Sequence, residues 1–290
     1  MLTNTTQLIE AYNKKQKELQ LRRWKVAAIV ALSCLGAAVV AVIAMFLSTA
    51  DIFKILSMVF GGITVLLFVL SLILRSTTSE KPLFEFMYKA VVDNQNFRRG
   101  QAISYTPSPK DLEVVADGGM FPRMATRQIR FVMNVPLENG QNARIFDAYL
   151  YTQSSKSRYV YFDGLYIVYA KPHTGYFQLR TTGSPKLKGV SFDKTRTAEK
   201  IREFVETGKS LRIPEVYYGL FTTLRERYPK SKIYIGATAS ELHLGISNYP
   251  LFRKMKTCTE ETIRQLSAFV EQIAELSKEI HLTVSKDEAR

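Results

Sequence analysis

The side chains that could do chemistry are few and far apart in this chain. The three histidines, His173, His243 and His281, have no second histidine or carboxylate at the spacing that a metal site requires. The sequence contains no phosphate-binding loop, no nucleophile elbow and no dinucleotide-binding fingerprint. We therefore expect no catalytic residue, no metal and no cofactor, and the protein is not predicted to be an enzyme.

The sequence around each residue that could act in catalysis predicts a turn or a strand position instead. His173 lies in a Lys-Pro-His-Thr-Gly stretch that predicts a solvated turn. His243 alternates with leucines in a predicted strand, and we expect its side chain to be exposed. Asp163 precedes Gly164, a pair that is typical of a hairpin turn. None of these residues is therefore expected to act as a general base.

Positive charge is the candidate binding feature. The formal net charge is +14, and such a chain is attracted to anionic headgroups by about 1 kcal/mol for each Lys or Arg near the surface. No basic stripe alternates with aromatic residues, so nucleic acid is not an expected partner. A generally basic, solvated surface is the alternative interpretation. The predicted anionic-lipid contact consists of Lys186, Lys188, Lys194, Arg196, Lys200 and Arg202.

Two apolar runs near the N-terminus would position these residues. Val26–Leu47 and Ile55–Leu74 contain no charged side chain. At about 1.5 Å per residue, each run as a helix matches the roughly 30 Å hydrocarbon core of a bilayer. The sequence thus predicts a transmembrane helical hairpin, with the protein integral to the lipid bilayer.

The flanking charges predict the orientation of that hairpin. Six basic residues precede the first run, and short positive flanks stay on the cytoplasmic side. We expect a multi-pass protein of the bacterial inner (plasma) membrane with both termini in the cytoplasm. The predicted parts are a cytoplasmic segment (1–25), the hairpin (26–74), juxtamembrane helices and a linker (75–125), and a cytoplasmic α+β domain (126–290).

The distal part shows alternating strand-like segments followed by helical ones. From residue 126 to 182, five Val-, Ile-, Tyr- and Phe-rich pieces predict an antiparallel meander. Residues 182–197 are predicted to be a loop, and 198–209 and 214–228 to be helices. A strand pair then surrounds Ala239 and Ser240. The fold class is α+β, with an antiparallel sheet, flanking helices and a long C-terminal helix.

The last helix, predicted from about Thr259 to Ile280, has the clearest pattern. Apolar residues recur at three- and four-residue spacing, and Thr257 and Glu260 are placed for a capping box. The apolar side could pack on the domain's own sheet or form a coiled-coil surface for a partner. The first interpretation is favoured because fewer than three clean heptads are present.

Several segments together resemble a bacterial family of two-span membrane proteins that carry a cytoplasmic domain of unknown function. They are the two apolar runs, Gly118–Phe121, Tyr159–Lys171 and Ile233–Phe252. The resemblance covers nearly the whole chain, although the segment after the central strands departs from the family pattern. Members are sometimes encoded beside LemA-type membrane proteins, which implies an envelope role. The family supplies no catalytic residues.

We therefore expect a membrane-anchored binding or scaffolding protein whose basic domain engages another protein or anionic lipid. The expected partners are a membrane protein, further copies of the chain, or anionic lipid. The alternative is an enzyme that acts on a lipid or envelope precursor without a readable motif. A polar pocket with clustered acids or a perturbed histidine would favour that alternative.

Overall fold

The computed structural model describes residues 5–47, 62, 81–99, 103–104, 111–122, 125–155, 157–198, 201–249 and 258–285. The chain forms two compact units, one within Asn4–Met87 and the other within Tyr88–Arg290. The second unit contains the sheet and all of the sites considered below.

Helix α1 (Thr5–Leu47) is one continuous helix of 43 residues. Among the described residues, no helix combines the length and the apolar character that crossing a bilayer requires. The expected transmembrane hairpin, and with it the multi-pass inner-membrane location, is therefore wrong. The run Val26–Leu47 is not a separate element, because it continues without a break from a segment rich in Lys and Arg. The run Ile55–Leu74 lies outside the described residues except for Gly62.

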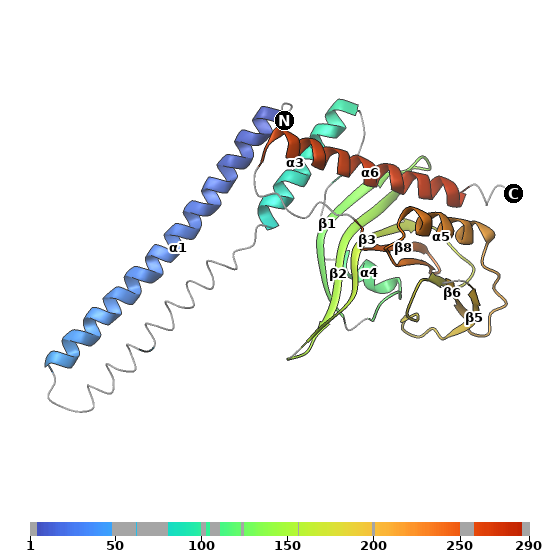
Figure 1. Cartoon of the computed structure of the whole chain (residues 1–290), viewed down its shortest axis with the longest axis horizontal. Coiled ribbons are helices and arrows are strands. Elements are labelled where there is room, and N and C mark those ends of the chain that lie inside the picture. The colour runs from blue at the N-terminus through green and yellow to red at the C-terminus, as the bar shows by residue number, and fades with distance from the viewer. Residues whose placement is uncertain are drawn as a thin grey trace. The chain divides into compact units, whose positions relative to one another are not determined.

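The described part of the second unit contains one sheet of eight antiparallel strands in the order β1-β2-β3-β8-β7-β4-β6-β5 (Figure 1). Consecutive strands β1 to β3 form a meander, and β5–β6 and β7–β8 are also pairs of consecutive strands. Non-sequential pairing joins β3 to β8, β7 to β4 and β4 to β6. The strands are β1 (Thr126–Pro136), β2 (Asn142–Gln153), β3 (Arg158–Ala170), β4 (Phe177–Arg180), β5 (Phe192–Ala198), β6 (Ile201–Glu206), β7 (Ile233–Ala237) and β8 (Glu241–Ser247).

Helices pack on both sides of this sheet. The short helix α4 lies on one side, and α5 and α6 lie on the other (Figure 1). We name the two sides of the sheet the α4 face and the α6 face, and successive residues of a strand alternate between them. The helices of this region are α3 (Lys81–Arg99), α4 (Asp111–Asp117), α5 (Glu215–Arg227) and α6 (Glu260–Ser285).

The α4 face carries an aromatic core. Phe121, Phe162 and Tyr234 form a ring cluster with centroids 4.9 to 6.0 Å apart. Tilted and edge-to-face ring pairs of this kind contribute about 0.5–1.5 kcal/mol beyond the area that they bury. Phe146 and Tyr166 extend the cluster across β2 and β3. The core therefore fixes how the segment after α4 lies against the sheet.

The α6 face is covered by the C-terminal helix. Ten α6 side chains are buried, including Ile263, Leu266, Val270 and Ile273 of the apolar pattern. The Tyr169 hydroxyl of β3 donates a hydrogen bond of 2.9 Å to the Ser277 carbonyl in the middle of α6. The expectation that this helix packs on the domain's own sheet is confirmed.

The N-terminal cap of α6 lies at a different residue from the predicted one. Thr259 caps the helix, because its Oγ1 accepts a hydrogen bond of 3.2 Å from the Thr262 amide. Thr257, the residue expected in a capping box, lies outside the described residues.

The predicted turn at Asp163 and Gly164 is wrong, because β3 runs through both residues as one strand. A Cβ at Gly164 would lie 2.1 Å from the Ile246 carbonyl oxygen of β8. Glycine is therefore needed here for close approach of two strands, not for a turn. The Asp163 carboxylate forms an ion pair with Arg130 at 2.5 Å.

The predictions for residues 182–209 are also wrong. Part of the expected loop forms the edge strand β5, and the expected helix contains β6. β6 pairs with β4 on one side and with β5 on the other. Hydrogen bonding to these neighbours overrides the helical preference of a segment with no strong local strand signal.

Candidate functional site

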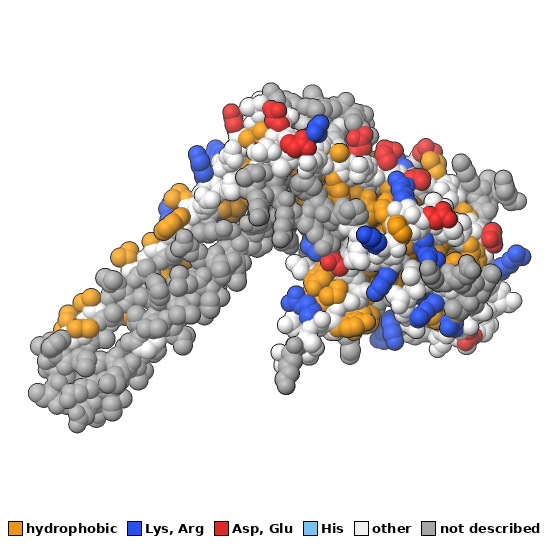
Figure 2. Space-filling model, in the orientation of Figure 1, with side chains coloured by type: hydrophobic (Ala, Val, Ile, Leu, Met, Phe, Trp, Pro, Cys, Tyr) orange, Lys and Arg blue, Asp and Glu red, His pale blue; other side chains and the backbone are white. Residues whose placement is uncertain are grey.

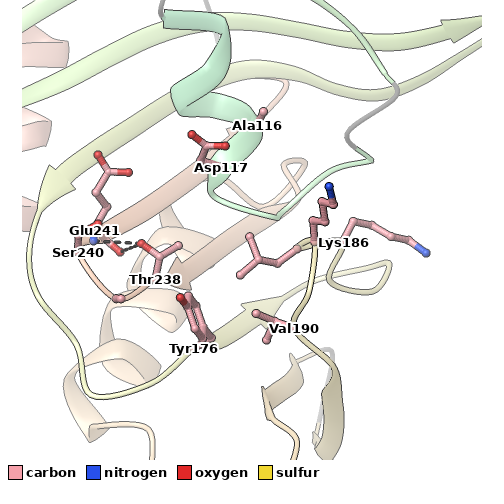
Figure 3. Close-up of a pocket in the computed structure, with 11 residues that line it drawn as sticks. Ala116, Asp117, Tyr176, Lys186, Val190, Thr238, Ser240 and Glu241 are labelled. Atoms are coloured by element: carbon pink, nitrogen blue, oxygen red, sulfur yellow. Dashed lines mark hydrogen bonds between the residues drawn. The ribbon is translucent and has the colours of Figure 1, made fainter.

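A polar pocket with a volume near 470 Å³ opens on the α4 face of the sheet. Four segments line it: the end of α4, Tyr176 just before β4, the loop between β4 and β5, and the β7–β8 hairpin (Figure 3). Asp117 comes from α4, Glu241 from the hairpin, and Lys186 and Lys188 from the loop. Side chains of both charge signs therefore face one cavity.

Two glycines end α4 and place Asp117 at the pocket. Gly119 has a φ angle of +60°, a conformation in which glycine avoids the steric cost of a Cβ. A Cβ at Gly118 would lie 2.4 Å from the Tyr166 hydroxyl and 2.7 Å from Nδ1 of His243. The end of α4 can thus approach the sheet closely because Gly118 lacks a side chain, whereas a Cβ at Gly119 would collide with Leu187 of the loop between β4 and β5.

The β7–β8 hairpin fixes the opposite part of the pocket. The Glu241 amide donates a hydrogen bond of 3.1 Å to the Thr238 hydroxyl, and the Thr238 amide donates one of 2.8 Å to the Glu241 carbonyl (Figure 3). These bonds close a tight connection through Ala239 and Ser240. Glu241 is therefore held at the start of β8, with its side chain at the pocket wall.

Behind Glu241 lies His243, a fully buried histidine on the same face of β8. Its Nδ1 is 3.2 Å from the Tyr166 hydroxyl, and its Nε2 is 3.2 Å from Oε2 of Glu241. The Nε2 contact is close enough for an ion pair, but Nε2 has no hydrogen-bond partner of good geometry among the described residues. The histidine thus connects a buried tyrosine to a carboxylate at the pocket.

These contacts affect the charge states around the pocket. The His243 imidazole lowers the pKa of the Glu241 carboxyl, although partial burial opposes this effect. Burial raises the pKa of Tyr166 well above its ordinary value, and the charge of Glu241 raises it further. Tyr166 therefore stays protonated, and its O–H can donate to Nδ1 of His243.

The loop between β4 and β5 is anchored by a buried arginine. Arg180 is 4% exposed, and it donates hydrogen bonds to the Gln178 side chain at 2.8 Å and to the Thr182 carbonyl at 3.1 Å. Its guanidinium lies 5.1 Å from the centroid of the Tyr234 ring. Burial lowers the pKa of Arg180 to about 10, so it remains charged at neutral pH.

A second anchor for the loop is the end of α4. The Lys186 amide donates a hydrogen bond of 2.7 Å to the Gly119 carbonyl, which also accepts one of 3.2 Å from the Gln178 side chain. Residues 181–190 are therefore held at their start by Arg180 and at their middle by the Lys186 amide, and Lys186 lies at the pocket.

The predicted lipid-contact residues lie partly together. Lys186 and Lys188 are exposed on the loop, and Lys194 and Arg202 are exposed on β5 and β6. Lys194 pairs with Phe204, which pairs with Gln178, so Lys194 and Arg202 both point to the α4 face. These four residues are called the basic patch below. Arg196 lies in β5, but its side chain, like the whole of Lys200, is outside the described residues.

Sequence reasoning missed most of the pocket. His243 is fully buried instead of exposed, and Asp117 and Glu241 had not been singled out. The one available signal was the spacing of Glu241 and His243, which puts both on one face of a strand. His173, expected to be solvated, is half-buried, and its Nε2 lies 2.7 Å from the Tyr217 hydroxyl.

Comparison of the chain with known proteins finds no relative. The chain matches no protein-family model, no curated protein and no solved structure. The resemblance to two-span membrane proteins therefore stays a prediction. Within the described residues, no group of three or more His, Cys, Asp and Glu side chains is arranged to hold a metal ion.

Proposed function

We propose that this chain is a binding protein that contacts anionic lipid headgroups through the basic patch. The observation that carries the proposal is that these four exposed cations lie on the same side of the sheet without an ion pair in the described structure. Arg130, Arg144, Arg227 and Arg264, in contrast, all pair with carboxylates.

The acidic residues of β5 and β6 that adjoin the basic patch, Asp193 and Glu203, are engaged elsewhere. The Asp193 carboxylate accepts a hydrogen bond of 3.1 Å from Thr207. Glu203 accepts one of 2.6 Å from Thr195 and one of 2.5 Å from Tyr218 of α5. Both acidic residues alternate with Lys194 and Arg202 along their strands, so their carboxylates point to the α6 face, away from the basic patch.

The pairing of β4 with β6 adds positive charge at this place. Arg180 and Arg202 lie directly opposite each other, an arrangement that is unfavourable for like charges. The charge of Arg202 contributes to the lowered pKa of Arg180, after the larger effect of burial. An anion bound over Arg202 would offset this repulsion.

The charge distribution on the second unit also favours contact between the basic patch and an anionic surface. Lys and Arg side chains predominate over the end of the sheet that holds β4 to β6, whereas Asp and Glu gather along α6 (Figure 2). Helix α6 itself carries five acidic and two basic residues. An anionic surface is therefore attracted to the basic patch and repelled by α6.

A vesicle flotation experiment tests the proposal on the full chain. Neutral phosphatidylcholine vesicles are compared with vesicles that also contain phosphatidylserine. We expect binding to the anionic vesicles, and a quadruple change to Gln at Lys186, Lys188, Lys194 and Arg202 should weaken it at least about tenfold. Each basic residue near an anionic surface contributes about 1 kcal/mol, which supports an effect of this size.

A matched variant separates the basic patch from net charge. It changes four exposed basic residues elsewhere to Gln: Lys89, Arg158, Lys230 and Lys232. This variant should keep most of the binding. Equal losses in the two variants would show that net charge alone attracts the protein, and the proposal would then be wrong.

Catalysis on a lipid or envelope precursor is the second candidate function. The observation in its favour is the pocket lined by Asp117 and Glu241, in which Glu241 lies 3.2 Å from a buried histidine. Mass spectrometry of phospholipids incubated with the wild-type protein and with a Glu241→Gln variant tests it. A product made only by the wild-type protein would favour an enzyme.

A further inference from the structure

The polar pocket has charges of opposite sign on different walls. Figure 3 shows Asp117 and Glu241 on one side of the cavity and Lys186 across from them. Neither Lys186 nor Lys188 forms an ion pair with another described residue. The volume near 470 Å³ is within the range of small-molecule sites, about 300–1,000 Å³.

The acidic wall is fixed in place. The Glu241 backbone is held by Thr238, and its carboxylate lies against the buried His243. The side chain of Glu241 is 30% exposed, so the carboxylate faces both the histidine and the cavity. It therefore presents a positioned negative charge, which is the arrangement that recognises an ammonium group.

His243 provides a separate indication of a ligand. Its Nε2 is fully buried and lacks a well-directed hydrogen bond, although Oε2 of Glu241 is only 3.2 Å away. A buried polar atom without a partner costs about 1–3 kcal/mol. A small rotation of the Glu241 carboxylate toward a bound cation would bring Oε2 and Nε2 into line. Binding would then complete a chain from Tyr166 through His243 to the ligand.

We infer that the pocket binds a small zwitterion that carries an ammonium group and a phosphate group. Glu241 and Asp117 hold the ammonium, and Lys186, with Lys188 at the rim, holds the phosphate. Lysines serve as point charges for phosphate, whereas a carboxylate is more often matched by the planar fork of an arginine. The acidic wall takes no part in the proposed contact of the basic patch with anionic lipid, so this inference goes beyond that function.

Isothermal titration of the full chain with O-phosphoethanolamine tests the site. We expect saturable binding, with ethanolamine alone and inorganic phosphate alone each at least about tenfold weaker, a difference of about 1.4 kcal/mol. The absence of saturable binding of O-phosphoethanolamine would overturn the inference. So would equal affinity for inorganic phosphate, because the acidic wall would then contribute nothing.

Two variants distinguish the walls of the pocket. Glu241→Gln keeps the shape of the side chain and should weaken O-phosphoethanolamine binding at least about tenfold without changing the affinity for inorganic phosphate. Lys186→Gln should weaken both ligands. Glu260→Gln, at an exposed acid on α6, is the matched control and should change neither. If Glu241→Gln does not fold, Asp117→Asn replaces it, since Asp117 is exposed.

The same chemistry occurs in a free metabolite and in a phospholipid headgroup. Vesicles with and without phosphatidylethanolamine, at equal content of phosphatidylserine, distinguish the two sources. Vesicle binding that rises with phosphatidylethanolamine and depends on Glu241 indicates the headgroup. Binding of the soluble probe without that dependence indicates the free molecule. If Glu241→Gln binds both O-phosphoethanolamine and the vesicles as the wild type does, the inference is wrong, even if the basic patch still binds anionic vesicles.

Discussion

The Tyr166 hydroxyl and Nδ1 of His243 lie 3.2 Å apart in a fully buried pair directly beneath Gly118. The pair connects adjacent strands β3 and β8 on the α4 face. The missing side chain at Gly118 leaves the space that both rings occupy. A change in this packing should therefore affect both the stability of the sheet and the geometry of the polar pocket.

Gly118→Ala should destabilise the protein by about 1–3 kcal/mol, because the added Cβ would collide with the Tyr166 hydroxyl and the His243 ring. Urea denaturation measures the change. The control is Gly219→Ala in α5, where nothing lies within 4 Å of an added Cβ. That change should stabilise the helix by about 0.5–1 kcal/mol. Similar losses at both positions would contradict the close packing at Gly118.

The ion-pair cluster around Arg130 should contribute more to the stability of the fold than ion pairs on the surface do. Arg130 contacts both Asp147 and Asp163 at 2.5 Å, and the side chain of Asp147 is only 7% exposed. Arg130→Met leaves a buried carboxylate without its cation, and we expect a loss of about 2 kcal/mol in the free energy of unfolding.

The control for Arg130 is Arg264→Met, which removes a pair with Glu261 of the same length, 2.5 Å, but with both side chains largely exposed. Its effect on the free energy of unfolding should be much smaller than that of Arg130→Met, because solvent screens such a pair. A loss at Arg264 as large as that at Arg130 would show that burial does not determine the strength of these pairs.

The lowered pKa of Glu241 predicts a pH dependence of stability. A carboxyl whose pKa is lower in the folded state stabilises the protein above its unfolded pKa, and this contribution is lost as pH falls through the folded pKa. His243 and Arg144 are the cationic or potentially cationic groups that lower it. The stability difference between wild type and Glu241→Gln should therefore shrink as the pH is lowered from 6 to about 3. A difference that is independent of pH would contradict the Glu241–His243 contact.

Helix α6 should be necessary for folding of the second unit. Ile273→Ala removes a fully buried side chain and should cost about 2–5 kcal/mol. Leu282→Ala, at a position that is 40% exposed, should cost much less. Removal of all residues after Thr257 should unfold the sheet, which increased dye binding and loss of tertiary circular dichroism would reveal. A folded, monomeric truncated chain would contradict this role.

Local patterns determined the elements whose side chains repeat regularly along one face. The alternation in β1, β2, β7 and β8 predicted strands, and the apolar spacing from Ile263 to Ile280 predicted α6 and its packing. These signals are local because each strand or helix buries one face, and the residues on that face recur at a regular spacing in the sequence. The same kind of reasoning failed for the transmembrane hairpin, where the length of an apolar run was taken as sufficient evidence for a membrane span.

Tertiary structure alone decided the rest. β5 and β6 are strands because they pair with β4, and Gly164 is glycine because β8 passes close to it. The polar pocket joins Asp117 to Glu241, more than a hundred residues apart, through strand order and register. The amino-acid sequence by itself thus determined the basic charge and the regular elements. Which polar groups meet, and which are buried, depended on non-local pairing that no local pattern encodes.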